Sequence, residues 1–312
     1  MERKLNPSKQ IIAVAICTFQ RNDPLETLLT ALIACAERIK EQARVAVVIA
    51  DDTAEGEARC VAERFRDKFE LGIEYHISGR QNISLNRNCA LEAAIRLGDW
   101  VAMIDDDCEP VPEWLEALLG VQRRTGADAV TGRLRRRVPP DAPKWFHTEP
   151  FLDLGVEEAG DAQEIPVGAT FNSLISSKWL KAHPEIRFEP SFGVISGEDM
   201  VFFRAARAAG LRVYYSERGY VFENEPPERA TLRYQLRLFF WHGNSAYLSS
   251  VEGGARRSRM LLHGLASLAR ALIRPGMRLA QGESLQLRYT LALMLHALGK
   301  VVGFLGVRIS HK

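Results

Sequence analysis

The sequence predicts an α/β fold with a mostly parallel central sheet flanked by helices, followed by a basic helical C-terminal extension. In the first half of the 312-residue chain, short apolar runs alternate with longer segments of helical period. Such alternation is typical of βαβ units, whose strands pair in parallel. Residues 251–312 hold ten Lys/Arg and two acids, whereas the remaining residues hold 31 basic and 37 acidic ones. We therefore expect one domain over residues 1–250 and a basic amphipathic tail over residues 251–312.

The predicted elements follow one another regularly up to residue 132. Apolar runs that read as buried strands cover residues 11–17, 45–50, 73–76, 100–104 and 129–132. Apolar residues at helical spacing predict helices over residues 25–41, 55–69, 84–97 and 112–125. Residues 133–166 have no clear period and predict a long irregular connection. A helix at 197–209, a strand at 212–215 and a long helix at 231–250 complete the expected domain.

Three adjacent carboxylates, Asp105, Asp106 and Asp107, directly follow the predicted strand at 100–104. Ligands of open α/β sheets bind at the carboxyl ends of the strands. Because adjacent carboxylates repel one another, they favour a site that holds a positive charge. A divalent cation that prefers oxygen ligands, Mg²⁺ or Mn²⁺, fits, with Asp105 and Asp107 on the same side of the strand. The alternative is an acidic turn before the helix that starts near Pro112.

Two more predicted strands end in polar residues. Asp51 and Asp52 follow the strand at 45–50, and Thr18, Phe19 and Arg21 follow the strand at 11–17. Parallel strands end at one edge of the sheet, so we expect these residues near the aspartate triplet. For Asp51 and Asp52 the alternative is a turn or a helix N-cap.

Glu198 and Asp199 stand at the start of the predicted helix at 197–209. There they would suit the helix dipole, which is the structural alternative. As a functional residue, one carboxylate would act as general base, removing a proton from a hydroxyl acceptor during sugar transfer. A single displacement of this kind would invert the anomeric centre.

These motifs, in this order, resemble family 2 glycosyltransferases with a GT-A (Rossmann-like) fold. The resemblance covers roughly residues 11–250, and Glu225-Pro226-Pro227-Glu228-Arg229 is similar to bacterial polysaccharide-assembly members. It implies a GT-A catalytic domain over residues 1–250. The motifs that carry it are Ala15-Ile16-Cys17-Thr18-Phe19-Gln20-Arg21, Val48-Ile49-Ala50-Asp51-Asp52, Asn86-Arg87-Asn88-Cys89-Ala90-Leu91, Ile104-Asp105-Asp106-Asp107 and Gly197-Glu198-Asp199.

The resemblance also implies roles for single residues. Asp107, with Asp105, would hold Mn²⁺ or Mg²⁺, and Asp199 would be the base with Glu198 as its neighbour. Asp51 or Asp52 would accept a hydrogen bond from the nucleobase of the donor. The N–H of uracil suits a carboxylate acceptor. The remaining nucleotide-sugar-binding residues would be Thr18, Phe19, Arg21, Arg87, Asn88, Asp105 and Asp106.

The implied reaction is metal-dependent, inverting transfer of a sugar from a nucleotide-diphosphate sugar, with a UDP-sugar as donor, to a hydroxyl of a saccharide or lipid-linked saccharide. The segment Phe222-Glu223-Asn224-Glu225 lacks the histidine that helps some relatives bind metal. The Gln-x-x-Arg-Trp motif of processive relatives is absent, which favours single addition.

The tail places Leu, Ile and Val at helical spacing among Arg and Lys, over residues 260–273 and 285–307. This pattern is typical of helices that lie on an anionic bilayer. It predicts a cytoplasmic protein, peripheral at the inner face of the plasma membrane. The alternative is helices that pack on the main domain with a solvated basic face.

Two other functions compete with sugar transfer. A nucleotidyltransferase would carry a glycine-rich phosphate loop after its first strand, and residues 18–22 contain no glycine. A non-catalytic relative that binds lipid or nucleotide would keep the fold without turnover. We expect no nucleic-acid partner, because a protein that binds nucleic acid would rarely place so many acidic residues at one edge of its sheet.

Overall fold

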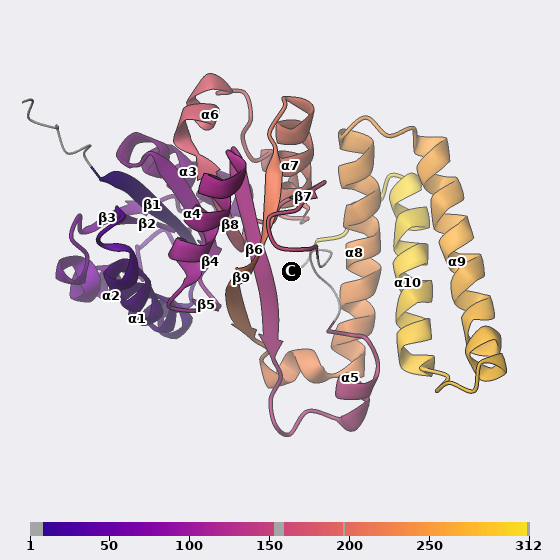
Figure 1. Ribbon diagram of the computed structural model, residues 1–312. Coiled ribbons are helices and arrows are strands. Elements are labelled where there is room, and N and C mark those ends of the chain that lie inside the picture. Colours follow the sequence, from indigo (N-terminus) through magenta and orange to yellow (C-terminus); the bar gives the residue numbers. More distant parts are fainter. Residues whose placement is uncertain (1–8, 153–158, 196, 311–312) are drawn as a thin grey trace, which may run out of the picture. The chain divides into compact units, whose positions relative to one another are not determined.

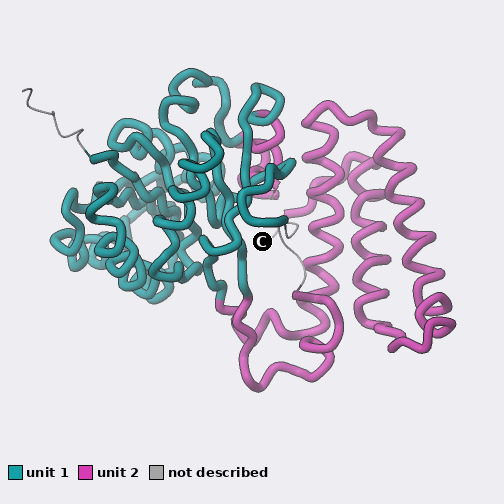
Figure 2. Tube along the Cα trace, in the orientation of Figure 1, with its two compact units in different colours: residues 1–135, 156–188, 206–223 teal, residues 136–155, 189–205, 224–312 magenta. Residues whose placement is uncertain are grey.

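The computed structural model describes residues 9–152, 159–195 and 197–310 (Figure 1). The chain forms two compact units (Figure 2). The first comprises residues 1–135, 156–188 and 206–223, and the second comprises residues 136–155, 189–205 and 224–312. Residue 250 lies inside the second unit, so the expected division into 1–250 and 251–312 stays a prediction.

The first unit is built on parallel strands in the order β3-β2-β1-β4. These strands are β1 (Gln10–Thr18), β2 (Ala43–Asp51), β3 (Ile73–Ile77) and β4 (Trp100–Asp105). The helices between and after them are α1 (Asn22–Ile39), α2 (Arg59–Phe65), α3 (Ile83–Leu97) and α4 (Trp114–Thr125). The predicted βαβ series is therefore confirmed in order and type.

Beyond β4 the sheet becomes antiparallel. It continues through β8 (Asn172–Ser176), β6 (Ala129–Arg137), β9 (Val213–Asn224) and β5 (Cys108–Pro110), and β7 (Glu164–Ile165) pairs with β9. β8 runs antiparallel to β4 and to β6, and β5 runs antiparallel to β9. The expectation of an irregular chain from residue 133 was wrong for 133–137, which continue β6. The strand expected at 212–215 extends to residue 224.

Alternate residues of the parallel strands face opposite layers of helices. Ile12, Val14 and Ile16 of β1 share one apolar core with Leu28 and Leu32 of α1, and this core also holds residues of α2 and α4. Each fully buried Leu or Ile contributes about 1.5–3 kcal/mol relative to an exposed position. The core therefore fixes the strand ends that carry the polar residues.

The opposite face of these strands is covered by α3, which contacts β1, β2 and β4. A Cβ added to Gly98, just after α3, would lie 2.7 Å from the carbonyl oxygen of Trp100 and 2.9 Å from the backbone nitrogen of Ala13. Only glycine allows this approach, so α3 ends there as predicted.

The second unit is dominated by three long helices that lie side by side (Figure 1): α8 (Leu232–Glu252), α9 (Arg257–Ala280) and α10 (Leu287–Phe304). A Cβ on Gly243 of α8 would lie 1.9 Å from the carbonyl oxygen of His296, and one on Gly299 of α10 would lie 2.1 Å from that of Phe240. Two glycines thus bring the α8 and α10 backbones into contact.

The shorter helices are α5 (Lys144–Thr148), α6 (Ser177–Ala182), α7 (Glu198–Ala208), η1 (Arg66–Lys68), η2 (Pro190–Phe192) and η3 (Pro227–Ala230). In the second unit, Phe146 and Phe151 form an aromatic cluster with Phe239 and Tyr289. Among the described residues, no helix is both long enough and apolar enough to cross a bilayer.

Candidate active site

The carboxyl ends of three parallel strands lie level with one another. Thr18 at the end of β1 is opposite Asp51 at the end of β2, and Cys17 is opposite Asp105 at the end of β4. The registers therefore bring these strand ends to one edge of the sheet. This is the arrangement expected of a ligand site in an open α/β sheet.

The aspartate triplet is neutralised by two arginines. Nη1 of Arg21 donates to Oδ1 of Asp106 at 3.1 Å and to Oδ2 of Asp107 at 2.8 Å. Nη2 of Arg87 donates to Oδ1 of Asp105 at 3.0 Å. Two arginine side chains thus supply positive charge next to the triplet.

Asp106 is the buried member of the triplet, with only 4% of its surface exposed. The hydroxyl of Thr18 donates to its Oδ2 at 2.8 Å. Burial raises the pKa of Asp106 to about 7, since the neighbouring Arg21 offsets the loss of solvent only in part. Asp105 and Asp107 keep partly exposed side chains. The triplet therefore offers two accessible carboxylates around a buried one.

The two aspartates after β2 accept hydrogen bonds from the surrounding turns. Asp51 accepts from the backbone N and hydroxyl of Thr53, the backbone N of Ala58 and the hydroxyl of Tyr75. The turn expected as the structural alternative is therefore formed around Asp51.

Asp52 holds the loop that leads into α3. Its Oδ1 accepts from the hydroxyl of Ser78 and the backbone N of Arg80 and Gln81, and its Oδ2 accepts from the backbone N of Asn82. These donors lie 26–30 residues away along the chain, so no local pattern around Asp52 could have predicted them.

The three residues of the Asn86-Arg87-Asn88 segment make contacts in three different places. The amide of Asn86 donates to the carbonyl of Ala50 at 3.0 Å and ties α3 to the end of β2. Arg87 reaches Asp105, as described above. Asn88 exchanges two 2.8 Å hydrogen bonds with the backbone of Phe188. Of the two predicted nucleotide neighbours, Arg87 faces the triplet, and Asn88 holds Phe188, whose ring lies 5.8 Å from the guanidinium of Arg87; their roles in nucleotide binding stay predictions.

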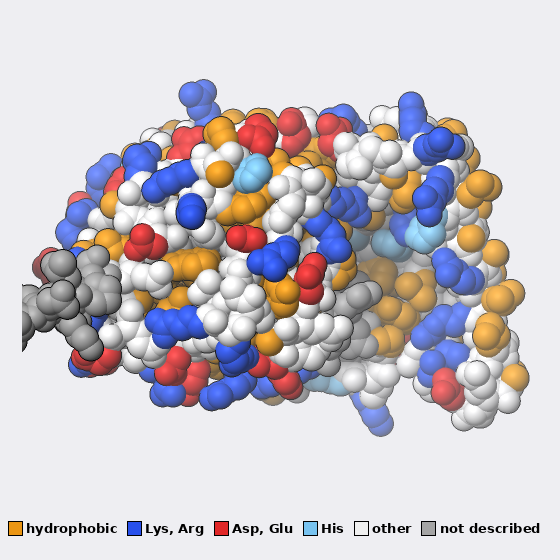
Figure 3. Space-filling view, turned by 45° about the horizontal axis from the view of Figure 1, so that its top comes forward, with side chains coloured by type: hydrophobic (Ala, Val, Ile, Leu, Met, Phe, Trp, Pro, Cys, Tyr) orange, Lys and Arg blue, Asp and Glu red, His pale blue; other side chains and the backbone are white. Residues whose placement is uncertain are grey.

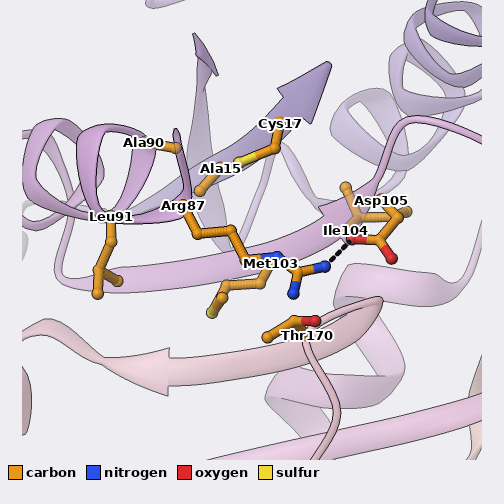
Figure 4. A pocket seen from close by; sticks show the side chains of 9 residues that line it. All are labelled: Ala15, Cys17, Arg87, Ala90, Leu91, Met103, Ile104, Asp105 and Thr170. Atoms are coloured by element: carbon orange, nitrogen blue, oxygen red, sulfur yellow. Dashed lines mark hydrogen bonds and ion pairs between the residues drawn. The ribbon is translucent and has the colours of Figure 1, made fainter. Parts of the chain in front are cut away.

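A pocket lies between α3 and the ends of β1 and β4 (Figure 4). It encloses about 250 Å³, open solvent included, and is lined by Ala15, Cys17, Arg87, Ala90, Leu91, Met103, Ile104, Asp105 and Thr170. The guanidinium of Arg87 points from α3 to the carboxylate of Asp105 (Figure 4). Sites for small molecules usually enclose about 300–1,000 Å³, so this pocket fits a fragment of a larger ligand.

Phe19 and Gln20 form the turn after β1. Phe19 is 38% exposed although it is aromatic, and Gln20 has a φ of 54°. Phe19 follows Thr18, which binds Asp106, and its exposed aromatic ring is available to stack on a planar group. The role of Phe19 in the nucleotide pocket stays a prediction.

Glu198 and Asp199 lie in the second unit, at the start of α7. The preceding Gly197 has a φ of 96°, and Oδ1 of Asp199 accepts a hydrogen bond from the backbone N of Met200 at 2.7 Å. Glu198 is buried, whereas Asp199 is partly exposed. Their roles as base and neighbour stay predictions.

A divalent cation would find a partial set of ligands at the triplet. Within the described parts of the chain, no three His, Cys, Asp or Glu side chains converge as a complete metal site. Mg²⁺ and similar cations are commonly held by one or two carboxylates together with substrate phosphates and water. The accessible Asp105 and Asp107 fit that pattern, in which phosphate and water would supply the other oxygens.

The sequence as a whole matches known glycosyltransferases. The family model of glycosyl transferase family 2 matches residues 13–183. The fold and the matched sequence define a glycosyltransferase. The chain belongs to glycosyl transferase family 2, as its motifs indicated.

Two relatives extend the match over most of the chain. The succinoglycan biosynthesis protein ExoM of Rhizobium meliloti is 32% identical over 305 residues, which cover 95% of this chain and 94% of that protein. A glucosyl-dolichyl phosphate glucuronosyltransferase of Haloferax volcanii is 26% identical over 244 residues, 75% of each chain.

Solved structures have the same fold. The mannosyltransferase PcManGT of Pyrobaculum calidifontis, in complex with GDP-Man and Mn²⁺, has a TM-score of 0.61 at 15% identity. The match covers 96% of this chain and 88% of the PcManGT chain. S. aureus TarS 1–349 in complex with UDP has a TM-score of 0.53 at 15% identity. The match covers 95% of this chain and 92% of the TarS chain. The predicted GT-A fold is thereby confirmed.

Proposed function

We propose that this protein is an inverting, metal-dependent glycosyltransferase of polysaccharide assembly. It transfers a sugar from a UDP-sugar to a hydroxyl of a saccharide or lipid-linked saccharide. The observation that carries the proposal is the level edge of three parallel strands, where Arg21 and Arg87 balance the triplet at Asp105 to Asp107. The names of two relatives, a succinoglycan biosynthesis protein and a glucuronosyltransferase, support the substrate class.

Hydrogen-bond capacity favours Asp52 over Asp51 as the residue that binds the nucleotide base. A carboxylate offers about four lone-pair positions. Both oxygens of Asp51 already accept two hydrogen bonds each. Among the described residues, Oδ2 of Asp52 accepts one hydrogen bond, from Asn82, and so keeps the capacity to accept another from the N–H of uracil. UDP as the nucleotide is supported by TarS, whose structures contain UDP and UDP-GlcNAc.

Mn²⁺ or Mg²⁺ would be held by Asp107 together with Asp105. When bound, such a cation neutralises the charge that develops on the leaving nucleoside diphosphate. Arg21 already neutralises part of the triplet and orients Asp107. Arg87 orients Asp105 from α3 in the same way. The complex of PcManGT with Mn²⁺ supports a divalent metal in this fold.

Asp199 is the proposed base that accepts the proton of the acceptor hydroxyl, and Glu198 is its neighbour. The hydrogen bond from the backbone of Met200 fixes one oxygen of Asp199. A single displacement by the acceptor inverts the anomeric carbon, so an α-linked donor gives a β-linked product. NMR of the anomeric proton of the product measures this directly, and a retained α-linkage would contradict single displacement.

The second unit is the proposed membrane-facing part. α9 exposes six large apolar side chains, namely Leu262, Leu265, Leu272, Ile273, Met277 and Leu279, and it carries five arginines. Exposed apolar groups flanked by arginines favour binding to an anionic bilayer surface. This supports a protein peripheral at the inner face of the plasma membrane. Co-sedimentation with phosphatidylglycerol vesicles, but not with phosphatidylcholine vesicles, is the expected result.

Release of nucleoside diphosphate tests the proposed reaction. A panel of UDP-sugars is incubated with the protein and a bacterial lipid extract, with Mn²⁺ or with EDTA. We expect UDP release from one donor only with metal, and a loss of about 100-fold or more in Asp199→Asn, since general bases contribute about that much. The exposed Asp67→Asn is the matched control. Equal turnover in Asp199→Asn would remove Asp199 from the mechanism, and no turnover with any donor would favour a non-catalytic relative.

A further inference from the structure

The three long helices of the second unit are almost free of acidic residues. α8, α9 and α10 together carry nine Lys/Arg and three His but a single acid, Glu252, at the last position of α8. Surface helices usually mix both signs of charge. So strong a bias requires either solvent or an anionic ligand to balance the positive charge.

Part of this charge gathers where the three helices meet. A Cβ on Gly264 of α9 would lie 3.2 Å from Cβ of Lys300 on α10, so Lys300 faces α9 beside His263. His296 stands one turn before Lys300 on α10, on the same side of the helix. The backbone contact between Gly243 of α8 and His296 brings α8 to the same place.

Lys300 is the most buried cation of this group. It is 7% exposed, and among the described residues its ammonium group makes no hydrogen bond or ion pair. Its ammonium nitrogen is not among the fully buried polar atoms of the described chain, so the buried part is the apolar stem and the charge stays open to an anion from solvent. The charged groups that shift the pKa values of Lys300, His263 and His296 are all cationic, and no acidic side chain is among them.

The neighbours of Lys300 are themselves cationic. Burial lowers the pKa of Lys300, and Arg270 lowers it further. Lys300, burial and Arg270 lower the pKa of His263. Burial, Lys300, His242 and His263 lower the pKa of His296 to about 4. Every charged neighbour acts in the same direction, which is the electrostatic environment of an anion site.

We propose that Lys300, His263, His296 and Arg270 form a phosphate-binding site at the meeting point of α8, α9 and α10. Phosphate and diphosphate groups carry the dense negative charge and the acceptor oxygens that ammonium, imidazole and guanidinium donors recognise. A metal ion is a poor fit, since no three metal-ligating side chains converge in the described chain and the cluster repels cations. The site lies outside the residues proposed for sugar transfer.

The surroundings of the cluster favour a phosphate carried by a lipid. On the helical part of the molecule, histidine and Lys/Arg side chains lie beside exposed hydrophobic ones (Figure 3). Leu262 and Leu265 of α9, next to His263 in the sequence, are 66% and 46% exposed. A free phosphate and a lipid headgroup share the same chemistry, so the two sources are separated by experiment.

The site is tested with the full chain in EDTA, so that the proposed metal-dependent donor site does not contribute. Inorganic pyrophosphate is titrated by calorimetry, and the ring signals of the histidines are followed by NMR. We expect the His263 and His296 signals to shift, and the affinity to fall at least tenfold in Lys300→Met. Lys178→Met, which removes an exposed lysine from α6, should bind pyrophosphate like the unmodified protein.

Lys300→Met keeps the apolar stem, which is the buried part of the side chain, so we expect it to fold. His263→Gln, at an exposed position, is the second variant and should also weaken binding. Two lipid probes are compared with pyrophosphate: phosphatidylglycerol vesicles, and phosphatidylcholine vesicles that contain an isoprenyl diphosphate. Shifts of the histidine signals with either lipid probe identify a lipid headgroup as the source, and shifts with pyrophosphate alone identify a free anion.

Absence of histidine shifts with all three probes would overturn the proposal. Equal pyrophosphate affinity in Lys300→Met, His263→Gln and the unmodified protein would overturn it as well. UDP release measured in parallel reports on the sugar-transfer site separately, so the two proposals fail independently.

Discussion

Replacement of Asp106 by asparagine should stabilise the metal-free protein at alkaline pH. The pKa of Asp106 is raised to about 7 by burial, from an ordinary value of 3.8. A carboxyl group with a raised pKa in the folded state binds its proton more tightly there than in the unfolded chain. Its contribution to stability is therefore full at low pH and is lost as pH rises from about 4 to about 7. Asparagine has the same shape and does not ionise.

The size of the effect follows from the same pKa. One pH unit corresponds to about 1.4 kcal/mol, and about two units separate pH 5 from the raised pKa. Between pH 5 and pH 8 the unmodified protein should therefore lose about 3 kcal/mol of stability that Asp106→Asn keeps. Urea unfolding in EDTA at both pH values measures it, with exposed Asp67→Asn as the control. The reasoning is refuted if Asp106→Asn is less stable than the unmodified protein at pH 8, because the ionised carboxylate would then be stabilised by Arg21 and Thr18 more than burial costs.

Three further variants test other parts of the account. Asn88→Ala breaks two hydrogen bonds to the backbone of Phe188 and should cost about 1–3 kcal/mol in urea unfolding. Gly243→Ala places a methyl group against the carbonyl of His296 and should lower the melting temperature by the equivalent of about 3 kcal/mol, whereas Gly120→Ala, with open space around it, should be neutral or stabilising. The pKa of His296 is lowered to about 4 from 6.5, so the neutral ring contributes about 3 kcal/mol to stability above pH 6.5. This contribution is lost as the pH falls to 4. His296→Phe should remove this pH dependence of stability in urea titrations.

The parallel half of the fold could be predicted because buried parallel strands appear as continuous apolar runs. β1 and β2 are buried along almost their whole length, and their sequences are nearly free of polar residues. β6 and β9 could not be predicted in full. β6 ends in Arg135, Arg136 and Arg137, and β9 is interrupted by Glu217 and Arg218, so neither shows a clean period.

Much of the candidate site was readable from strand ends alone. Placing Thr18, Asp51 and Asp105 on one edge needed only parallel pairing. The different contacts of neighbouring aspartates could be learned only from the three-dimensional structure. Asp52 differs from Asp51 because the loop at residues 78–82 folds back onto it, and Asp106 differs from its neighbours because it alone is buried under Thr18.

Donor binding tests the central claim most directly. Calorimetry of UDP binding, with Mn²⁺ and with EDTA, is compared between the unmodified protein and Asp107→Ala. The account predicts binding of UDP only with Mn²⁺ and a loss of affinity of at least tenfold in Asp107→Ala, while GDP and CDP bind weakly or not at all. UDP binding that is equally strong in EDTA, or unchanged in Asp107→Ala, would contradict a metal-assisted donor site at the carboxyl ends of these strands.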